Sequence, residues 1–278
     1  MKLTQAILPV AGLGTRFLPW TKVVPKELLP IGNQPIIALL VDECLSIGIK
    51  DICFVISRGK EAIPQYFYEQ PELEAELESR GKLHMLEELN RYDNVNFHVA
   101  YQEQMKGDGH AILQARDWVK SDNVAILFGD DLIVGKKNGL EQLKAGLKDL
   151  DAKKDSAILC LQEVEEHLIH KYGVVDLDHP WSKKNPHPTV RKVKGLVEKP
   201  KPEDAPSNLG IVGKYIIPKA LIEKLHTIEV GSHGGEVRLI DALIAERKRI
   251  DIYGCIFEGK RFDTGTPEGY KEAMQVLG

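Results

Sequence analysis

A glycine-rich loop that directly follows a buried strand constrains the fold of this chain more than any other feature. Residues 6–10 are apolar and predict a buried strand, and residues 11–16 (AGLGTR) follow it and run on through three prolines. A helix pattern then covers residues 35–48, with a proline at its start and a glycine at its end, and residues 51–57 predict the next strand. The chain therefore opens with a β-loop-α-β unit, which is typical of an α/β fold.

Strand and helix patterns continue to alternate after this unit. Further strands are predicted over residues 95–101, 124–128 and 156–164, and helices over residues 71–92, 108–119 and 139–150. The segment 71–92 is rich in charge and indicates a helix with a solvated outer face. Alternation of this kind predicts a largely parallel sheet with helices on both faces.

The pattern changes beyond residue 165. Loops rich in proline and lysine cover residues 180–188 and 200–206, and short strands are predicted at residues 195–198 and 210–217. We interpret these segments as insertions that form a substrate lid. Helices over residues 218–225, 236–249 and 267–277 and a strand over residues 250–258 complete the predicted elements.

Charge and cysteine content exclude several classes of protein. The 37 basic residues nearly balance the 41 acidic residues, so an electrostatic nucleic-acid binder is not expected. The four cysteines lie far apart, mostly in apolar runs, and predict buried free thiols in a cytoplasmic setting. The longest apolar runs are too short for a membrane span. The length of 278 residues fits one large domain or two small ones.

The glycines of the loop would let backbone N–H groups approach phosphate oxygens, and two familiar phosphate loops can be tested against it. A dinucleotide fingerprint would need a third glycine where Phe17 stands and an acidic residue at the end of the second strand, where Ser57 and Arg58 stand. A Walker-type loop would need a lysine directly after Gly14, where Thr15 stands. The sequence disfavours both loops, and with the first it disfavours a dehydrogenase.

A third arrangement uses the cations that follow the glycines, namely Arg16, Lys22 and Lys26. Such cations can hold a triphosphate by charge-assisted hydrogen bonds. A plain structural turn is the remaining alternative, but charge, glycine and proline are concentrated here beyond the needs of a turn. We therefore expect a triphosphate site at this loop.

Aspartates stand at two places where strands are predicted to end. Asp130 and Asp131 follow an apolar strand, at the carboxyl edge where open α/β sheets bind ligands, and Asp263 precedes a Thr-Gly turn. Carboxylate oxygens suit Mg²⁺, which takes one or two carboxylates together with phosphates and water. Each aspartate could instead cap a turn, and for Asp131 we prefer that interpretation.

Short motifs occur in order along most of the chain. They are GLGTRFLP (12–19), TK (21–22), PKELLP (25–30), RGK (58–60), Gln102, GDGHA (107–111), GDD (129–131), YGVV (172–175), VEKP (197–200), SNL (207–209), GGE (234–236) and FDTG (262–265). This series resembles the bacterial UTP-glucose-1-phosphate uridylyltransferases, a family of sugar nucleotidyltransferases. The resemblance spans essentially the whole chain.

The resemblance implies a fold and a reaction. The fold is α/β, a Rossmann-like three-layer αβα nucleotidyltransferase fold with a mostly parallel mixed central sheet and sugar-binding insertions. Residues 1–278 would form a single domain, with a nucleotide-binding part at 1–165 and a sugar-binding part with closing helices at 166–278. The reaction would transfer a uridylyl group from UTP to glucose 1-phosphate by Mg²⁺-dependent in-line attack at the α-phosphorus. The products would be UDP-glucose and pyrophosphate, and relatives are commonly homodimers or homotetramers.

The resemblance also assigns roles to residues. The catalytic residues it implies are Arg16, Lys26 and Lys199. Nucleotide binding falls to Ala11, Gly12, Gly14, Thr15, Glu27, Gln102, Gly107 and Asp130, sugar binding to Gly173, Glu198, Lys199 and Glu236, and Mg²⁺ binding to Asp130 and Asp263. A carboxylate at a helix N-terminus explains Glu236 equally well, and a strand bend explains Gly173. His110 begins a helix pattern, and we predict a structural role for it.

Several positions depart from the pattern of the family, and we expect them to border the base and sugar pockets. They are Trp20, Tyr101, Asp108, Arg238 and Ile240. The metal and phosphate groups are intact, so two alternatives stay open. One is the same chemistry with dTTP or another sugar 1-phosphate, and the other is a regulatory sugar-nucleotide-binding homologue with low turnover.

Overall fold

The computed structural model describes residues 2–150, 152–153, 155–179, 189–228 and 235–278. The strands are β1 (Leu3–Pro9), β2 (Pro30–Ile31), β3 (Gln34–Pro35), β4 (Asp51–Ile56), β5 (Asn96–Tyr101), β6 (Asn123–Leu127), β7 (Asp131–Val134), β8 (Ala157–Glu163), β9 (Gly173–Leu177), β10 (Val190–Glu198), β11 (Leu209–Pro218), β12 (Ile252–Ile256) and β13 (Lys260–Asp263). The helices are α1 (Ile36–Ser46), α2 (Ala62–Gln65), α3 (Pro71–Ser79), α4 (Leu83–Leu89), α5 (Asp108–Gln114), α6 (Gly139–Asp149), α7 (Lys219–Leu225), α8 (Leu239–Glu246) and α9 (Pro267–Leu277). The first predicted lid loop, 180–188, and Gly234 lie outside the described residues.

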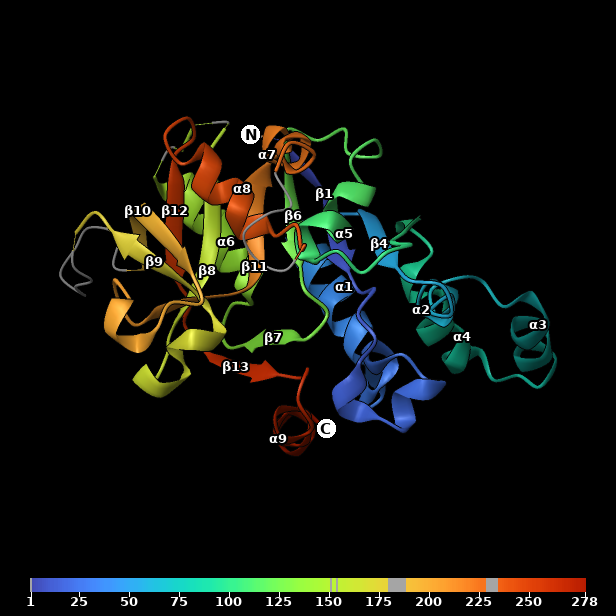
Figure 1. Cartoon of the computed structure of the whole chain (residues 1–278). Coiled ribbons are helices and arrows are strands. Elements are labelled where there is room, and N and C mark those ends of the chain that lie inside the picture. The colour runs from blue at the N-terminus through green and yellow to red at the C-terminus, as the bar shows by residue number, and fades with distance from the viewer. Residues whose placement is uncertain (1, 151, 154, 180–188, 229–234) are drawn as a thin grey trace.

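A nine-stranded sheet in the order β5-β4-β1-β6-β11-β8-β12-β10-β9 organises the molecule (Figure 1). Strands β5, β4, β1 and β6 run parallel, as the alternating pattern predicts. Strands β8 and β12 also pair parallel. The prediction of a mostly parallel sheet is wrong for the other pairs, because β11 is antiparallel to β6, β8 and β9, and β10 is antiparallel to β12 and β9. Two parallel neighbouring strands need a long crossover connection, which is usually a helix. Among the described residues no α-helix lies between β9 and β10 or between β10 and β11, so the chain has no such crossover there.

Alternate residues of β1 show that helices cover both faces of the sheet. Ala6 and Leu8 pack in one apolar cluster with the buried side chains of α1 and α6, whereas Ile7 packs in a second cluster with α5, α7 and α8. Successive side chains of a strand point to opposite faces, so the two clusters lie on opposite sides of the sheet. The predicted three-layer αβα arrangement is therefore confirmed.

Helix boundaries differ from the predictions where local chemistry interrupts the periodicity. The predicted helix over residues 71–92 is wrong, since two helices, α3 and α4, meet near Gly81, whose φ of 67° lies in the left-handed region. In Figure 1 these helices extend from the side of the molecule away from β9 and β10. The predicted helices over 108–119 and 236–249 are too long, while α1, α6 and α9 match their predictions closely.

The carboxyl ends of the parallel strands meet at one edge of the sheet and carry the predicted nucleotide loops. The glycine-rich loop follows β1, Gln102 follows β5, and Asp130 follows β6. Strand β7 continues from Asp131 and pairs antiparallel with β13, which places Asp263 opposite Asp131. This small pair and α9 lie together below the main sheet in Figure 1.

All four cysteines are buried and free, as their apolar surroundings predict. In the part of the chain that the structure describes, no helix has the length and apolar character needed to cross a bilayer.

Candidate active site

Two adjoining cavities open at the carboxyl edge of the parallel strands. The first has a volume of about 470 Å³ and lies between the loop after β1, the start of α5 and the end of β6. The second, of about 270 Å³, lies between the end of β10, the start of β9 and β11. Asp108, Phe128 and Asp130 line both cavities. Ligands in the two cavities would therefore meet at these three side chains.

The first cavity gathers every residue predicted to bind the nucleotide. These lining residues are Ala11, Gly12, Gly14, Thr15, Glu27, Gln102, Gly107 and Asp130. Gly14 turns the loop with a φ of 65°, a value that a side chain rarely tolerates, and a 3-10 turn (Thr15–Phe17) begins directly after it. The sequence thus brings these residues to one place, and their individual roles stay predictions.

Lys60 belongs to the RGK motif and is a buried cation of this cavity region, for which the sequence predicted no role. Its Nζ donates to Oε2 of Glu27 at 2.9 Å and to the carbonyl of Val10 at 2.7 Å. Burial raises the pKa of Glu27 and lowers that of Lys60, while the attraction between the two charges opposes both shifts. The ion pair fixes one carboxylate oxygen of Glu27. In the sequence, the one indication of this pair was a lysine that follows a glycine in the turn after the buried strand β4.

Gln102 and His110 form a side-chain network next to the first cavity. Nε2 of Gln102 donates to the carbonyl of Gly107 at 3.0 Å and lies 3.2 Å from Nδ1 of His110. Nε2 of Gln114 lies 3.3 Å from the other ring nitrogen. Burial, followed by the charge of Lys106, lowers the pKa of His110. Two glutamine amides therefore engage this ring, which favours the structural role predicted for it.

Lys26 and Asp130 form an ion pair at the junction of the two cavities, with 2.8 Å between Nζ and Oδ2. Burial acts to lower the pKa of Lys26 and to raise that of Asp130. Burial is the largest single influence on each, but the partner's charge, the hydrogen bond between the two groups and other nearby charges together outweigh it, so the pKa of Lys26 is raised and that of Asp130 is lowered. Both groups therefore remain charged at neutral pH, ready to contact anionic phosphates.

Asp130 and Asp263 lie close to each other beside Gly265. A Cβ at Gly265 would lie 2.7 Å from Oδ2 of Asp130 and 3.0 Å from Oδ1 of Asp263. Hydrogen bonds hold this turn, from the Gly265 amide to Oδ1 of Asp263 at 3.0 Å and from the Thr264 amide to the Asp130 carbonyl at 2.8 Å. Two neighbouring carboxylates supply the hard oxygen ligands that suit Mg²⁺. No group of three or more acidic, histidine or cysteine ligands occurs among the described residues, so substrate oxygens and water would complete such a site.

Arg16 lies beside this junction rather than in a cavity wall. Its Nη1 donates to the carbonyl of Gly265 at 3.2 Å, which places the guanidinium at the turn that follows Asp263. Neither Arg16 nor Asp263 is among the described residues that line the two cavities. Lys22 is exposed and is likewise absent from both walls. The structure therefore brings Arg16 next to the carboxylates and leaves Lys22 apart.

The second cavity holds most of the residues predicted to bind the sugar. Gly173, Glu198 and Lys199 line it, whereas Glu236 lines the first cavity. Lys199 has a φ of 44°, which is uncommon outside glycine and often found at functional sites. Its Nζ lies 3.6 Å from Oε1 of Glu198. A Cβ at Gly173 would lie 2.5 Å from Cδ1 of Ile240, so a side chain there would push the end of Ile240 aside.

Asp131 has a structural role, but not as the predicted turn cap. It is the first residue of β7, and its Oδ2 accepts from the Gly213 amide of β11 at 2.9 Å while Oδ1 accepts from Nε of Arg261. Nη1 of Arg261 also donates to the Tyr172 hydroxyl at 3.3 Å. Arg261 lines the second cavity near Lys199, and sequence reasoning missed this cation because its partners are remote in sequence.

Two of the five departures from the family pattern line a cavity wall, and a third bonds residues of the walls. Asp108 lines both cavities and Ile240 the second, while Arg238 bonds the wall residues Glu198 and Glu236. The expectation is wrong for the other two. Neither Trp20 nor Tyr101 is among the described residues that line the two cavities. Trp20 is exposed, and the ring of Tyr101 lies under the guanidinium of Arg58 at 4.2 Å.

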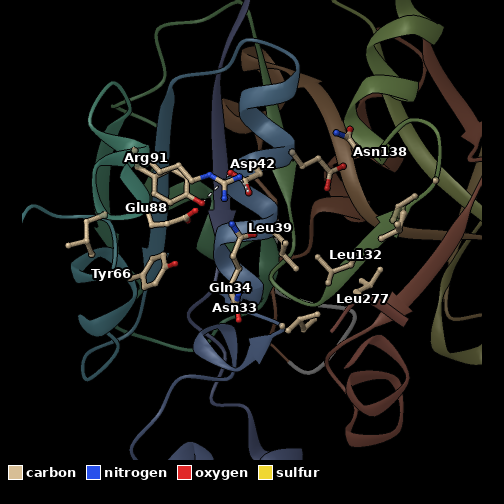
Figure 2. A pocket seen from close by; sticks show the side chains of 18 residues that line it. Asn33, Gln34, Leu39, Asp42, Tyr66, Glu88, Arg91, Leu132, Asn138 and Leu277 are labelled. Atoms are coloured by element: carbon tan, nitrogen blue, oxygen red, sulfur yellow. Dashed lines mark hydrogen bonds and ion pairs between the residues drawn. The ribbon is translucent and has the colours of Figure 1, made fainter. Parts of the chain in front are cut away.

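A larger cavity of about 920 Å³ lies apart from this site, among α1, β7 and the end of α9. Figure 2 shows Asp42 and Arg91 joined in one wall, with Nη2 and Oδ2 2.7 Å apart. The Tyr92 hydroxyl also donates to Asp42 at 3.2 Å. None of the predicted site residues is among the described residues that line this cavity. Size alone therefore does not identify the reaction site.

Comparisons with known protein sequences agree with the ordered motifs. A family model described as nucleotidyl transferase matches residues 5–278. A UTP–glucose-1-phosphate uridylyltransferase of Bacillus subtilis is 40% identical over 270 residues, which cover 97% of this chain and 89% of the relative. A protein of the same name from Staphylococcus epidermidis is 38% identical, with 97% and 90% of the two chains covered.

Comparisons with solved structures agree with the fold. A UDP-glucose pyrophosphorylase complexed with UDP-glucose superposes with a TM-score of 0.82 at 33% identity, covering 99% of this chain and 98% of the other. A UTP-bound enzyme of the same kind from Acinetobacter baumannii gives a TM-score of 0.86 at 32% identity, covering 98% and 92%. The likeness therefore extends over both cavities.

Proposed function

Because this chain belongs to the nucleotidyl transferase family, we propose that it transfers a uridylyl group from UTP to glucose 1-phosphate and releases pyrophosphate. The product is UDP-glucose. The observation that carries this proposal is the position of Asp130, which lines both cavities and binds Lys26 where they meet. Two phosphate-bearing ligands, one in each cavity, would meet at this carboxylate and its cation.

The reaction needs positioning and charge neutralisation more than it needs proton transfer. An oxygen of the sugar phosphate attacks the α-phosphorus of UTP, the new P–O bond forms, and the bond to pyrophosphate breaks on the opposite side. The nucleophile is already an anion, so no general base is required. We assign Lys26 and Arg16 to the triphosphate and Lys199 to the sugar phosphate, where they offset the repulsion between two anions.

Members of the family generally use a divalent metal, and we propose Mg²⁺ held by Asp130 and Asp263. When bound, Mg²⁺ supplies positive charge to the α-phosphate and the incoming phosphate. The close approach of the two carboxylates beside Gly265 supports this choice. Lys26 neutralises one of these carboxylates in the ligand-free chain and lies close enough to contact a phosphate there.

Each cavity is assigned to one of the two substrates. We assign uracil recognition to the first cavity, where the carboxylate of Glu27, the amide of Gln102 and the backbone at Ala11, Gly12 and Gly107 can match a donor and acceptor edge. The remaining loop residues, Gly14 and Thr15, would face the phosphates. We assign the hexose to the second cavity, with residues 1–165 serving the nucleotide and residues 166–278 serving the sugar. We expect a homodimer or homotetramer.

One alternative substrate has structural support. Ile240 lines the second cavity and Arg238 bonds Glu198 of its wall, and both depart from the family pattern, so another sugar 1-phosphate is the alternative that the geometry favours. A low-turnover homologue is disfavoured, because the charged residues of the proposed mechanism are all present. Arg16, Lys26, Asp130 and Asp263 lie near the junction of the cavities, and Lys199 lines the second cavity.

Pyrophosphate release from a panel of nucleoside triphosphates and sugar 1-phosphates tests the function. We expect UTP with glucose 1-phosphate to give the highest kcat/KM, and chelation of the divalent metal to abolish the reaction until Mg²⁺ is restored. Lys199→Ala and Asp130→Ala should each lower kcat/KM by roughly 100-fold or more. Lys201→Ala changes an exposed lysine outside both cavities and serves as the matched control. Wild-type rates in either site variant would contradict the assignment.

A further inference from the structure

We propose that Arg261 binds the phosphate of the incoming sugar 1-phosphate through Nη2, together with Lys199. The inference rests on the proposed function, in which Lys199 alone holds this phosphate. Lys199 follows β10 and Arg261 lies on β13, so two cations from different strands hold the group that attacks UTP. Arg261 is then a catalytic residue, because it touches the attacking phosphate.

The guanidinium of Arg261 lies in the wall of the second cavity. Its Nε donates to Oδ1 of Asp131, and its Nη1 donates to the Tyr172 hydroxyl at 3.3 Å. The guanidinium carbon also lies 5.7 Å from the centre of the Tyr172 ring. Asp131 and Tyr172 line this cavity together with Arg261. Two residues of the wall therefore fix the position and the orientation of the guanidinium.

One nitrogen of this guanidinium is left for a ligand. Arginine has five N–H donors, one on Nε and two on each Nη. The Nε donor goes to Asp131, and the two Nη1 donors go to the Tyr172 hydroxyl and, at 3.2 Å, to Oε1 of Gln162. Among the described residues Nη2 has no hydrogen-bond partner, and protein atoms do not enclose it. Since Arg261 lines the second cavity, the two Nη2 donors are open to a ligand there.

Arg261 also lies next to the carboxylates at the junction of the two cavities. Strands β7 and β13 pair antiparallel, with Asp263 opposite Asp131. Arg261 comes two residues before Asp263, so both side chains leave β13 on the same face. Its partner Asp131 directly follows Asp130, which lines both cavities. A phosphate that approaches Asp130 from the second cavity therefore lies beside the guanidinium of Arg261.

Burial makes Arg261 the cation that acts most strongly inside the second cavity. Three described cations line this cavity, namely Lys171, Lys199 and Arg261, together with four described carboxylates. Because the carboxylates outnumber the cations, an incoming phosphate needs direct contact with a cation. Lys171 is exposed and the side chain of Lys199 is 49% exposed, so water screens both of these charges. The side chain of Arg261 is 10% exposed, and its hydrogen bond to a phosphate is screened less.

Kinetics of the full chain test the contact, with the formation of UDP-glucose measured as each substrate is varied. Arg261→Gln should raise the KM for glucose 1-phosphate by about tenfold or more, because a hydrogen bond from a charged group is lost, and leave the KM for UTP within about threefold. Arg261→Lys keeps the charge without the planar fork, so its KM for glucose 1-phosphate should fall between those of wild type and Arg261→Gln. Lys260→Gln is the matched control, since Lys260 is the neighbouring cation on β13, is 53% exposed and is not among the described residues that line either cavity.

Two more variants separate contact with the phosphate from the support that Arg261 gives to Asp131. Arg261→Gln leaves the Asp131 carboxylate, which is 8% exposed, without its cation, so it should also lower the midpoint of urea unfolding. Adding Asp131→Asn removes this charge and should recover most of the midpoint, while the KM for glucose 1-phosphate stays raised by about tenfold. Asp131→Asn alone keeps the cation and should change that KM by less than about threefold.

Inorganic phosphate identifies the part of the substrate that Arg261 contacts. At saturating UTP, inorganic phosphate competes with glucose 1-phosphate for the sugar site. Its inhibition constant should rise in Arg261→Gln by about the same factor as the KM for glucose 1-phosphate. An unchanged inhibition constant beside a raised KM would assign Arg261 to the hexose ring and overturn the proposal.

The remaining outcomes are equally decisive. A wild-type KM for glucose 1-phosphate in Arg261→Gln would overturn the proposal, as would equal increases in both KM values. Recovery of this KM in the double variant would overturn it too, because the effect would then come from Asp131. If Arg261→Gln does not fold, the double variant and Arg261→Lys carry the test by the same criteria. Failure of the proposed function looks different, since the wild-type chain would then form no UDP-glucose from UTP and glucose 1-phosphate.

Discussion

Asp108 should make the stability of this protein depend on pH in an unusual direction. It is the first residue of α5, and its carboxylate accepts a hydrogen bond from the Leu239 amide at 2.8 Å. Burial raises its pKa from the ordinary 3.8 to about 6, although the amides of Leu239 and Gly109 act in the opposite direction. The folded chain therefore keeps this proton to higher pH than the unfolded chain does.

The sign and size of the effect follow from this difference. As pH rises from about 4 to about 6, the unfolded chain loses the proton first, so the free energy of unfolding falls. Above pH 6 both states are charged, and the loss is complete at about 3 kcal/mol. Asp108→Asn can keep the bond from Leu239 but cannot titrate. At pH 4.0 the unfolded carboxyl is already partly ionised, so we expect this variant to gain about 2.4 kcal/mol relative to wild type between pH 4.0 and pH 7.5.

Urea unfolding of both proteins at the two pH values measures this gain, because contributions from all other titrating groups cancel in the difference. Asp117→Asn is the matched control, since that side chain is 88% exposed, and it should change the free energy of unfolding by no more than about 0.5 kcal/mol. A gain below about 0.5 kcal/mol for Asp108→Asn, or one of opposite sign, would refute the reasoning.

Two further substitutions test the packing around the first cavity. Gly107→Ala should cost about 2–4 kcal/mol, because its Cβ would lie 2.5 Å from the Val237 carbonyl at a φ of 93°, whereas Gly48→Ala, with a φ of 84° and open space, should cost about 1–2 kcal/mol. If Gly107→Ala and Gly48→Ala lost similar amounts of stability in thermal unfolding, the contact with the Val237 carbonyl would not matter. Lys60→Met should cost about 3–5 kcal/mol by leaving Glu27 buried without its cation, and adding Glu27→Gln should recover part of this loss. A loss below about 1 kcal/mol would contradict the importance of the pair.

The sequence predicted the nucleotide loops well because each depends on local signals. A glycine-rich loop behind a buried strand placed Gly12 and Gly14, and an apolar strand ending in acid placed Asp130. Parallel strands then bring such loop residues to one edge without further information. The same logic failed for β11, whose direction depends on connections between remote segments rather than on its own apolar run.

The parts that sequence reasoning missed are pairings between distant residues. Lys60 reaches Glu27 across 33 positions, and Arg261 reaches Asp131 across 130. Arg238 was recognised as a departure from the family pattern, but its bridge to Glu198 spans 40 positions. Neither the periodicity nor the spacing of residues in the sequence predicts such contacts, because they form only when the sheet and its helices pack together.

Strand β11 sets a limit on how this protein can be divided. It belongs to the half assigned to the sugar, yet it pairs with β6 along five positions, from Lys214 opposite Leu127 to Pro218 opposite Asn123. A chain ended at residue 165 would lose β11 and expose the apolar β6 as an open edge, where a neighbouring molecule could add a strand. Such a fragment would aggregate rather than persist as a smaller nucleotide-binding protein.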